Sequence, residues 1–230
     1  MWQNDQSRCL HRRYRGVVPT LEPVVSRVGA DVVPFGLWPV TADDAGWLRL
    51  HGAMRPAEVG MAVWSLLFHS GPIGDALVVP DTPAEALRLL AGLDTVYAPG
   101  GLLLADSTTG VLVEPGCCCD LFEWRDWLGT LNGLLVDLGH SPAPEVEYHG
   151  DVVRVWAEGG DEATPPADRA CVDVDRAALS DLLRSAQRDL VGFLDVTRIW
   201  ANEVAPRQAD QFVAALDAGL AISEPLPLPA

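Results

Sequence analysis

Three consecutive cysteines, Cys117, Cys118 and Cys119, have side chains that could bind a metal ion or react as nucleophiles. Thiolates bind soft ions such as zinc and Cu(I), and an activated thiolate attacks electrophiles. Three adjacent residues seldom direct all three side chains at one ion, so at most two of them would be ligands. Further ligands would come from elsewhere in the chain, and the candidates are His140, His149 and Cys171. Two other roles remain open for the triplet, a reactive thiol and small buried packing residues.

His140 lies in a short loop between Gly139 and Pro144 that also contains Pro142. Loops often carry binding residues, so His140 is a candidate ligand or binding residue. The alternative is a surface turn in which the imidazole hydrogen-bonds a backbone carbonyl. If His140 acts together with the cysteine triplet, the cofactor is zinc or copper; otherwise we expect no cofactor.

The surroundings of the triplet limit its chemistry. Cys-x-x-Cys pairs are absent from the sequence, which excludes a zinc ribbon or a thioredoxin-like motif. Glu114, Asp120 and Glu123 flank the triplet, and negative neighbours disfavour a thiolate, while only Arg125 acts in the opposite direction. The sequence also lacks the GxSxG, HExxH, GxGxxG, P-loop and EF-hand motifs. It therefore favours a non-catalytic protein and leaves a new kind of enzyme open.

Eight tryptophans are many for a chain of 230 residues. Trp124 and Trp127 are three residues apart on an expected helix, and Trp156 lies on an expected strand. Tryptophan is enriched at energetically important contacts, so these three residues, with His140, are our candidate binding residues. The alternative for the three indole rings is packing in the core.

The elements that must position these residues alternate between hairpins and helices. Val-rich segments within 17–40 are interrupted by prolines, which predicts short edge strands or extended chain. Hairpins are predicted over 101–113 and 145–156, on either side of the triplet and the His140 loop. Helices are expected after Pro56 and after the predicted N-cap residues Thr82, Asp120 and Asp175, and a final helix follows Pro206. Because the strands come in hairpins, the predicted fold class is α+β, with antiparallel hairpins packed with helices and a helical hairpin at the end.

Composition changes along the chain suggest four parts. Residues 1–16 are basic and predict a disordered or arm segment, and 17–157 form an α+β domain. Residues 158–170 are rich in Gly, Pro and acidic side chains, as in a linker or loop. Residues 171–223 form a helical C-terminal part that we expect to pack on the same domain.

Acidic residues dominate the charge of the chain, with 32 Asp and Glu against 16 basic residues and a net charge of -16. Such a surface repels nucleic-acid backbones and anionic membranes, so we expect neither as a partner. All the basic residues are Arg, which excludes Schiff-base lysine chemistry and the Walker A lysine. No signal peptide or long apolar span is recognisable, so we expect a cytoplasmic protein with free thiols.

Part of the chain resembles an uncharacterised family of small acidic proteins from high-GC bacteria. The matching pattern is Glu114-Pro115-Gly116-Cys117-Cys118, then Trp124, then Gly139-His140-x-Pro142-x-Pro144, then Val153-x-Val155-Trp156. The pattern covers roughly a fifth of the chain. No activity is assigned to that family, so the resemblance implies no catalytic role for any residue here.

Two functions follow from these observations. The first is a cytoplasmic, non-catalytic binding protein of the immunity or accessory type, whose acidic surface binds a basic protein partner. The alternative is a metal- or thiol-dependent protein with a site formed by Cys117–Cys119 and His140. The oligomeric state and the identity of a partner are left open by the sequence.

Overall fold

The computed structural model describes residues 19–28, 36–41, 46–70, 80–159 and 169–228. The predicted arm over 1–16 lies outside the described residues. So does most of the predicted linker over 158–170.

One sheet contains four antiparallel strands in the order β2-β1-β3-β4. They are β1 (Thr20–Ser26), β2 (Trp47–Arg49), β3 (Gly100–Asp106) and β4 (Val111–Val113). The β3–β4 hairpin is the first hairpin predicted from the sequence, and residues between Asp106 and Val111 form its turn as expected.

The prediction of edge strands for the Pro-rich segment is wrong for β1, which pairs with β2 on one side and β3 on the other. Its Pro23 is tolerated in this inner strand because the pairing with β2 starts only at Val24. The ring nitrogen of Pro23, which has no proton to donate, therefore has no ladder hydrogen bond to make there. The carbonyl of Pro23 still accepts a hydrogen bond from the Leu50 N–H at 2.9 Å.

A second sheet contains three antiparallel strands in the order β5-β6-β7. They are β5 (Glu145–His149), β6 (Val152–Trp156) and β7 (Cys171–Asp175), and β5 with β6 form the second predicted hairpin. Across β6 and β7, Arg154 donates to Asp173 in a two-pronged ion pair at 2.7 and 2.8 Å.

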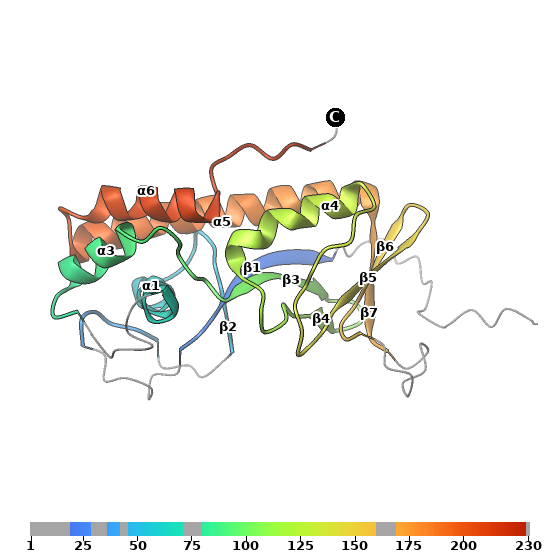
Figure 1. The fold of residues 1–230 in the computed structure, drawn as a ribbon, viewed down its shortest axis with the longest axis horizontal. Coiled ribbons are helices and arrows are strands. Elements are labelled where there is room, and N and C mark those ends of the chain that lie inside the picture. Colours follow the sequence, from blue (N-terminus) through green and yellow to red (C-terminus); the bar gives the residue numbers. More distant parts are fainter. Residues whose placement is uncertain (1–18, 29–35, 42–45, 71–79, 160–168, 229–230) are drawn as a thin grey trace, which may run out of the picture.

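The chain ends in a helical hairpin, as predicted. The long helix α5 (Arg176–Val204) runs along the strands, and α6 (Ala209–Leu220) returns beside it (Figure 1). Asp175 occupies the N-cap position of α5, but its side chain makes no capping hydrogen bond, which corrects the capping role expected for it. The helices α1 (Pro56–Ser70) and α3 (Pro83–Ala91) lie near the end of the helical hairpin where α5 ends and α6 begins (Figure 1).

The helix predicted after Asp120 differs in type from our expectation. It is a 3₁₀ helix, η1 (Leu121–Trp127), continued by the short α-helix α4 (Leu128–Leu131). Side chains three residues apart are aligned in a 3₁₀ helix, and Leu121, Trp124 and Trp127 have this spacing and are all buried. The 3₁₀ geometry thus turns both tryptophans of the segment toward the core.

The architecture is α+β, with antiparallel hairpins packed against helices. A single hydrophobic cluster joins buried residues from the predicted 17–157 and 171–223 parts, including Leu21, Trp124, Phe193 and Phe212. No helix in the described part of the chain has both the length and the apolar character needed to cross a membrane.

Candidate functional site

Backbone hydrogen bonds bring the cysteine turn and the His140 loop together. The Gly116 N–H donates to the Leu138 carbonyl at 2.8 Å, and the Cys117 N–H donates to the His140 carbonyl at 2.6 Å. Within the turn, the Cys119 N–H donates to the Gly116 carbonyl at 3.1 Å. The main chain therefore fixes the spacing of the two loops without using the side chains of the cysteines or of His140.

Two glycines allow this close approach. A Cβ atom at Gly116 would lie 2.4 Å from the His140 backbone nitrogen and 2.6 Å from the Pro142 carbonyl oxygen. Gly139 has a φ of 78°, and a Cβ there would lie 2.9 Å from the sulfur of Cys119. No role was predicted for these glycines from the sequence, although each directly precedes a candidate ligand, and that adjacency was the available signal.

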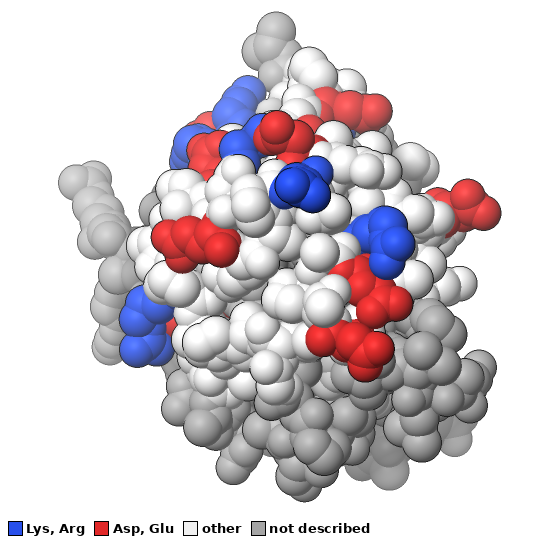
Figure 2. All heavy atoms as spheres, turned by 90° about the vertical axis from the view of Figure 1, so that its left-hand side faces the viewer, with Lys and Arg blue, Asp and Glu red and all other residues white. Residues whose placement is uncertain are grey.

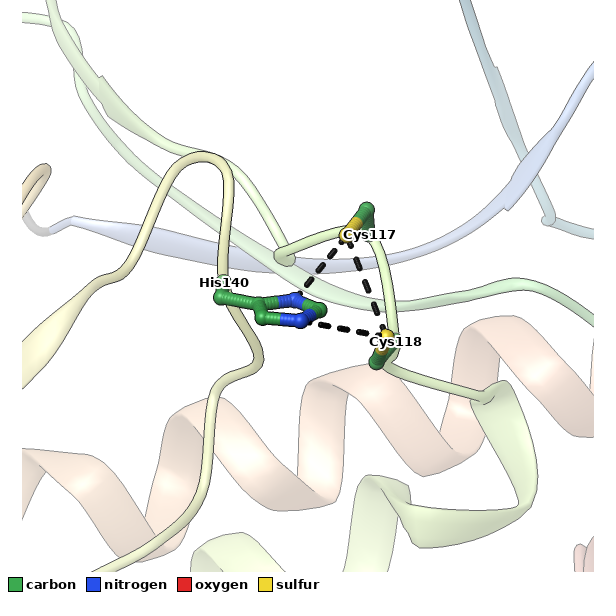
Figure 3. A group of neighbouring side chains, drawn as sticks. All are labelled: Cys117, Cys118 and His140. Atoms are coloured by element: carbon green, nitrogen blue, oxygen red, sulfur yellow. Dashed lines mark hydrogen bonds between the residues drawn. The ribbon is translucent and has the colours of Figure 1, made fainter.

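The side chains of Cys117, Cys118 and His140 form one exposed cluster (Figure 3). Cys117 Sγ lies 3.0 Å from His140 Nδ1, Cys118 Sγ lies 3.7 Å from His140 Nε2, and the two sulfurs are 3.9 Å apart. Figure 3 shows the nitrogen-bearing edge of the imidazole facing the cysteines, which come from the opposite loop. One potential ligand atom from each residue lies within 4.8 Å of the other two.

The structure therefore brings together two of the three candidate cysteines with His140, in agreement with the argument that at most two adjacent cysteines share a site. Because Cys117 and Cys118 are exposed, the packing alternative does not apply to them. The carbonyl-capping alternative for His140 is replaced by contacts with two thiols.

Cys119 is separated from the cluster. Its thiol is half-buried, facing Gly139, and burial raises its pKa to about 11. The nearby charges of Glu123 and Asp137 act in the same direction. Cys119 thus fits the packing role that was considered for all three cysteines, and its place in the predicted metal site is not supported by its position.

The electrostatics around Cys118 disfavour its ionised form when no cation is near. Its hydrogen bond with Cys117 is the main cause that raises the pKa of the Cys118 thiol. Slight desolvation and the charges of Cys117 and Asp137 act in the same direction. A bound cation would reverse this preference, because it stabilises the thiolates that the negative surroundings destabilise.

Asp120 fixes the end of the cysteine turn. Its carboxylate accepts the Ala98 N–H at 2.7 Å and the Phe122 N–H at 3.1 Å, and together with Glu123 it forms the capping box of η1. Burial raises the pKa of Asp120, while its backbone hydrogen bonds act in the opposite direction. The predicted N-cap role of Asp120 is confirmed, and it joins the site to the core.

The other candidate ligands lie elsewhere. His149 is on β5, where its Nε2 lies 3.2 Å from Glu147. Cys171 is on β7 and is disulfide-bonded, so the expectation of free thiols holds for Cys117, Cys118 and Cys119 but not for Cys171. Neither residue belongs to the cluster.

The candidate binding tryptophans are buried. Trp124, Trp127 and Trp156 are 1%, 4% and 2% exposed, and Trp124 Nε1 donates to the Leu220 carbonyl at 2.9 Å. Of the two alternatives for these residues, the structure favours core packing. In this conformation a partner would reach none of the three indole rings.

A small cavity lies behind the cysteine turn, between η1 and the β3–β4 hairpin. Its volume is about 20 Å³, and Cys119, Asp120, Glu123 and Trp124 contribute to its lining. A space of this size holds about one water molecule. Chemistry at this site would therefore take place at the exposed cluster rather than in the cavity.

Fold and site together define an α+β protein with an exposed thiol–imidazole cluster on two bridged loops. Comparison with known protein families, with curated proteins and with solved structures finds no match for this chain. The resemblance to a family of small acidic bacterial proteins accordingly stays a prediction. The geometry of the cluster is the feature of this chain that bears on its function.

Proposed function

We propose that the protein binds one thiophilic metal ion, zinc or Cu(I), through Cys117, Cys118 and His140. The observation that carries the proposal is the spacing of three potential ligand atoms on two loops whose backbones are hydrogen-bonded to each other. Thiolate and imidazole are the donors that these soft and borderline ions prefer.

The distances support this ligand set. With Zn–S and Zn–N bonds of about 2.3 and 2.05 Å, tetrahedral coordination separates two sulfurs by about 3.8 Å and a sulfur from a nitrogen by about 3.6 Å. The corresponding separations here are 3.9 Å between the sulfurs and 3.7 Å from Cys118 Sγ to His140 Nε2. An ion bound to His140 Nε2 would replace the contact of this nitrogen with Cys118 Sγ, and the thiol of Cys117 would turn toward the ion from Nδ1, which it contacts at 3.0 Å.

The coordination would be incomplete with these three residues alone. No fourth His, Cys, Asp or Glu joins the cluster among the described residues. Closed four-ligand sites are typical of structural zinc, whereas three protein ligands with an open position are typical of ions that exchange or meet further ligands. An exposed three-residue site is therefore better suited to reversible metal binding than to holding the fold together.

The test is metal binding by the reduced protein, measured by native mass spectrometry and by competition with a chromophoric chelator. We expect one zinc or Cu(I) ion per chain, and at least a hundredfold loss of affinity in Cys117→Ser/Cys118→Ser and in His140→Ala. Cys119→Ser and His149→Ala are matched controls and should bind like the wild type. Unchanged binding by the Cys117/Cys118 variant would overturn the proposal.

The net charge of -16 supports a second proposal, the binding of a basic protein partner by an acidic surface. On the face seen in Figure 2, acidic side chains are interspersed with arginines and uncharged surface, so this face does not form a continuous acidic patch. Charge-steered binding weakens as salt is added. Capture of a basic partner that is insensitive to ionic strength would contradict this second proposal.

A further inference from the structure

Cys117 and Cys118 are adjacent in sequence, exposed, and have sulfur atoms only 3.9 Å apart. His140 contacts both sulfurs, at 3.0 and 3.7 Å. Redox-sensitive cysteines combine a low thiol pKa with solvent access and, often, a neighbouring second thiol that completes the reaction. The cluster has the last two properties, and His140 beside both sulfurs is the group that can take up a thiol proton, whether or not the cluster also binds a metal ion.

We propose that hydrogen peroxide oxidises Cys117 and Cys118 to a disulfide between adjacent residues, and that this reaction reversibly switches off metal binding at the cluster. The second half of this inference rests on the proposed function. The first half concerns only the two thiols and stands independently of it.

The reaction proceeds in two balanced steps. One sulfur attacks a peroxide oxygen, so that an S–O bond forms, the O–O bond breaks, and water leaves after taking up the thiol proton. The second sulfur then attacks the resulting sulfenic acid, which forms the S–S bond and releases a second water. In sum, two thiols and one hydrogen peroxide give one disulfide and two waters, with the thiols oxidised and the peroxide reduced.

His140 is placed to assist both steps. Its two ring nitrogens face different sulfurs, so one imidazole can accept the proton of one thiol and hydrogen-bond the other. This proton-accepting role follows from the direct contacts of the two nitrogens with the reacting sulfurs.

Cys119 is excluded from the reaction by its placement. It is half-buried and faces Gly139, on the inner side of the turn. Peroxide and a second sulfur both reach it less easily than they reach the exposed pair. Disulfide formation is therefore expected to involve Cys117 and Cys118 specifically.

The bond would be labile. Adjacent Cα atoms are about 3.8 Å apart across a trans peptide, which is shorter than the usual separation of about 4.4 to 6.8 Å in disulfides. Strained and exposed disulfides are easily reduced, as regulatory ones are. The oxidised form should therefore return to the dithiol with a mild thiol reductant, and the ligands Cys117 and Cys118 would become available again.

The experiment uses the full chain, reduced and stripped of metal with a chelator, then treated with a small excess of hydrogen peroxide. We expect the mass of the peptide that contains Cys117 and Cys118 to fall by two hydrogen atoms, and both exposed thiols to become resistant to alkylation. In Cys118→Ser, the sulfenic acid of Cys117 should persist and be trapped by dimedone. Cys119→Ser is the control and should form the disulfide as fast as the wild type.

Metal binding is measured on the same samples. Zinc binding should fall from one ion per chain to none after oxidation and recover after treatment with a monothiol reductant. If peroxide leaves the mass and the alkylation pattern unchanged, or if Cys119→Ser abolishes the disulfide, the redox inference is wrong. If the disulfide forms but the reduced protein binds neither zinc nor Cu(I), the proposed function fails while the redox reaction stands.

Discussion

The cysteine turn and the η1 segment that follows it are neighbours in sequence, yet the side chains of the first are available for binding and those of the second are packed in the core. Cys117 and Cys118 are exposed, and their turn is held by backbone hydrogen bonds to the His140 loop. Trp124 and Trp127 are buried, and they contribute to the fold through packing. Backbone hydrogen bonds hold the cysteine turn in place, whereas side-chain packing holds η1. Substitutions of the cysteine side chains should therefore change binding, and substitutions of the tryptophans should change stability.

The largest effect should come from Trp124→Ala in η1. Trp124 is 1% exposed and its indole donates to the Leu220 carbonyl, so its removal leaves a cavity and an unpaired acceptor. Truncation of a buried Trp costs about 3–5 kcal/mol, and urea unfolding should show a loss of stability of that size. Metal binding by the folded fraction should not change.

Leu135→Ala provides the control for this prediction, because Leu135 is 81% exposed and its loss should change stability by less than about 0.5 kcal/mol. Should Trp124→Ala not fold, Trp124→Phe retains most of the apolar volume and should show a smaller loss in the same direction. Equal stability of Trp124→Phe, Leu135→Ala and the wild type would contradict the assignment of Trp124 to the core.

The second effect separates Cys119 from its neighbours. A thiol of pKa about 11 is only about 0.1% thiolate at pH 8, against roughly a quarter for an ordinary thiol of pKa about 8.5. Alkylation of Cys119 at pH 8 should therefore be about a hundredfold slower in the native protein than in urea. Because the thiolate reacts, the native rate should rise about tenfold for each pH unit up to about pH 11.

Peptide mass mapping after iodoacetamide treatment measures this rate in Cys117→Ser/Cys118→Ser, where Cys119 is the remaining thiol of the triplet. Burial of the Cys119 thiol also slows its alkylation in the native protein. The urea-unfolded chain, in which this thiol is not buried, gives the reference rate. Native and unfolded rates that agree within a factor of a few would show that Cys119 is as accessible as the exposed pair.

The comparison also shows what the sequence can and cannot predict. Turn residues and hydrophobic spacing predicted both hairpins and the N-cap at Asp120, since these depend on local preferences. The spacing of Trp124 and Trp127 was compatible with either an α- or a 3₁₀-helix, so their burial depended on tertiary packing. Local patterns therefore predicted the elements, but did not decide between core packing and binding for these indole rings.

The site was predicted only in part, for a similar reason. Chemical type identified the cysteines and His140, which is 23 residues from Cys117. The choice of His140 over His149 and Cys171 depends on where two loops meet, which no local pattern specifies. That meeting depends on main-chain contacts at Gly116 and Gly139, where even one additional methyl group would not fit.

A third and smaller effect is expected from Gly116→Ala, which tests whether the backbone, rather than the cysteine side chains, sets the geometry of the cluster. The added Cβ would lie 2.4 Å from the His140 nitrogen, so the two loops must separate by a fraction of an ångström or more. Separation moves His140 away from both sulfurs and should weaken zinc binding about tenfold. Displacements of ligands from their best geometry commonly have effects of this size.

Amide hydrogen exchange at Cys117 provides a readout that does not depend on metal. In the wild type this N–H donates to the His140 carbonyl, and in Gly116→Ala the bond should weaken and exchange should accelerate. Gly46→Ala is the matched control, because a Cβ there meets no atom within 4 Å. If the Cys117 amide exchanges at the wild-type rate in Gly116→Ala while zinc binding still falls, the glycine acts on the ligands by another route than the spacing of the loops.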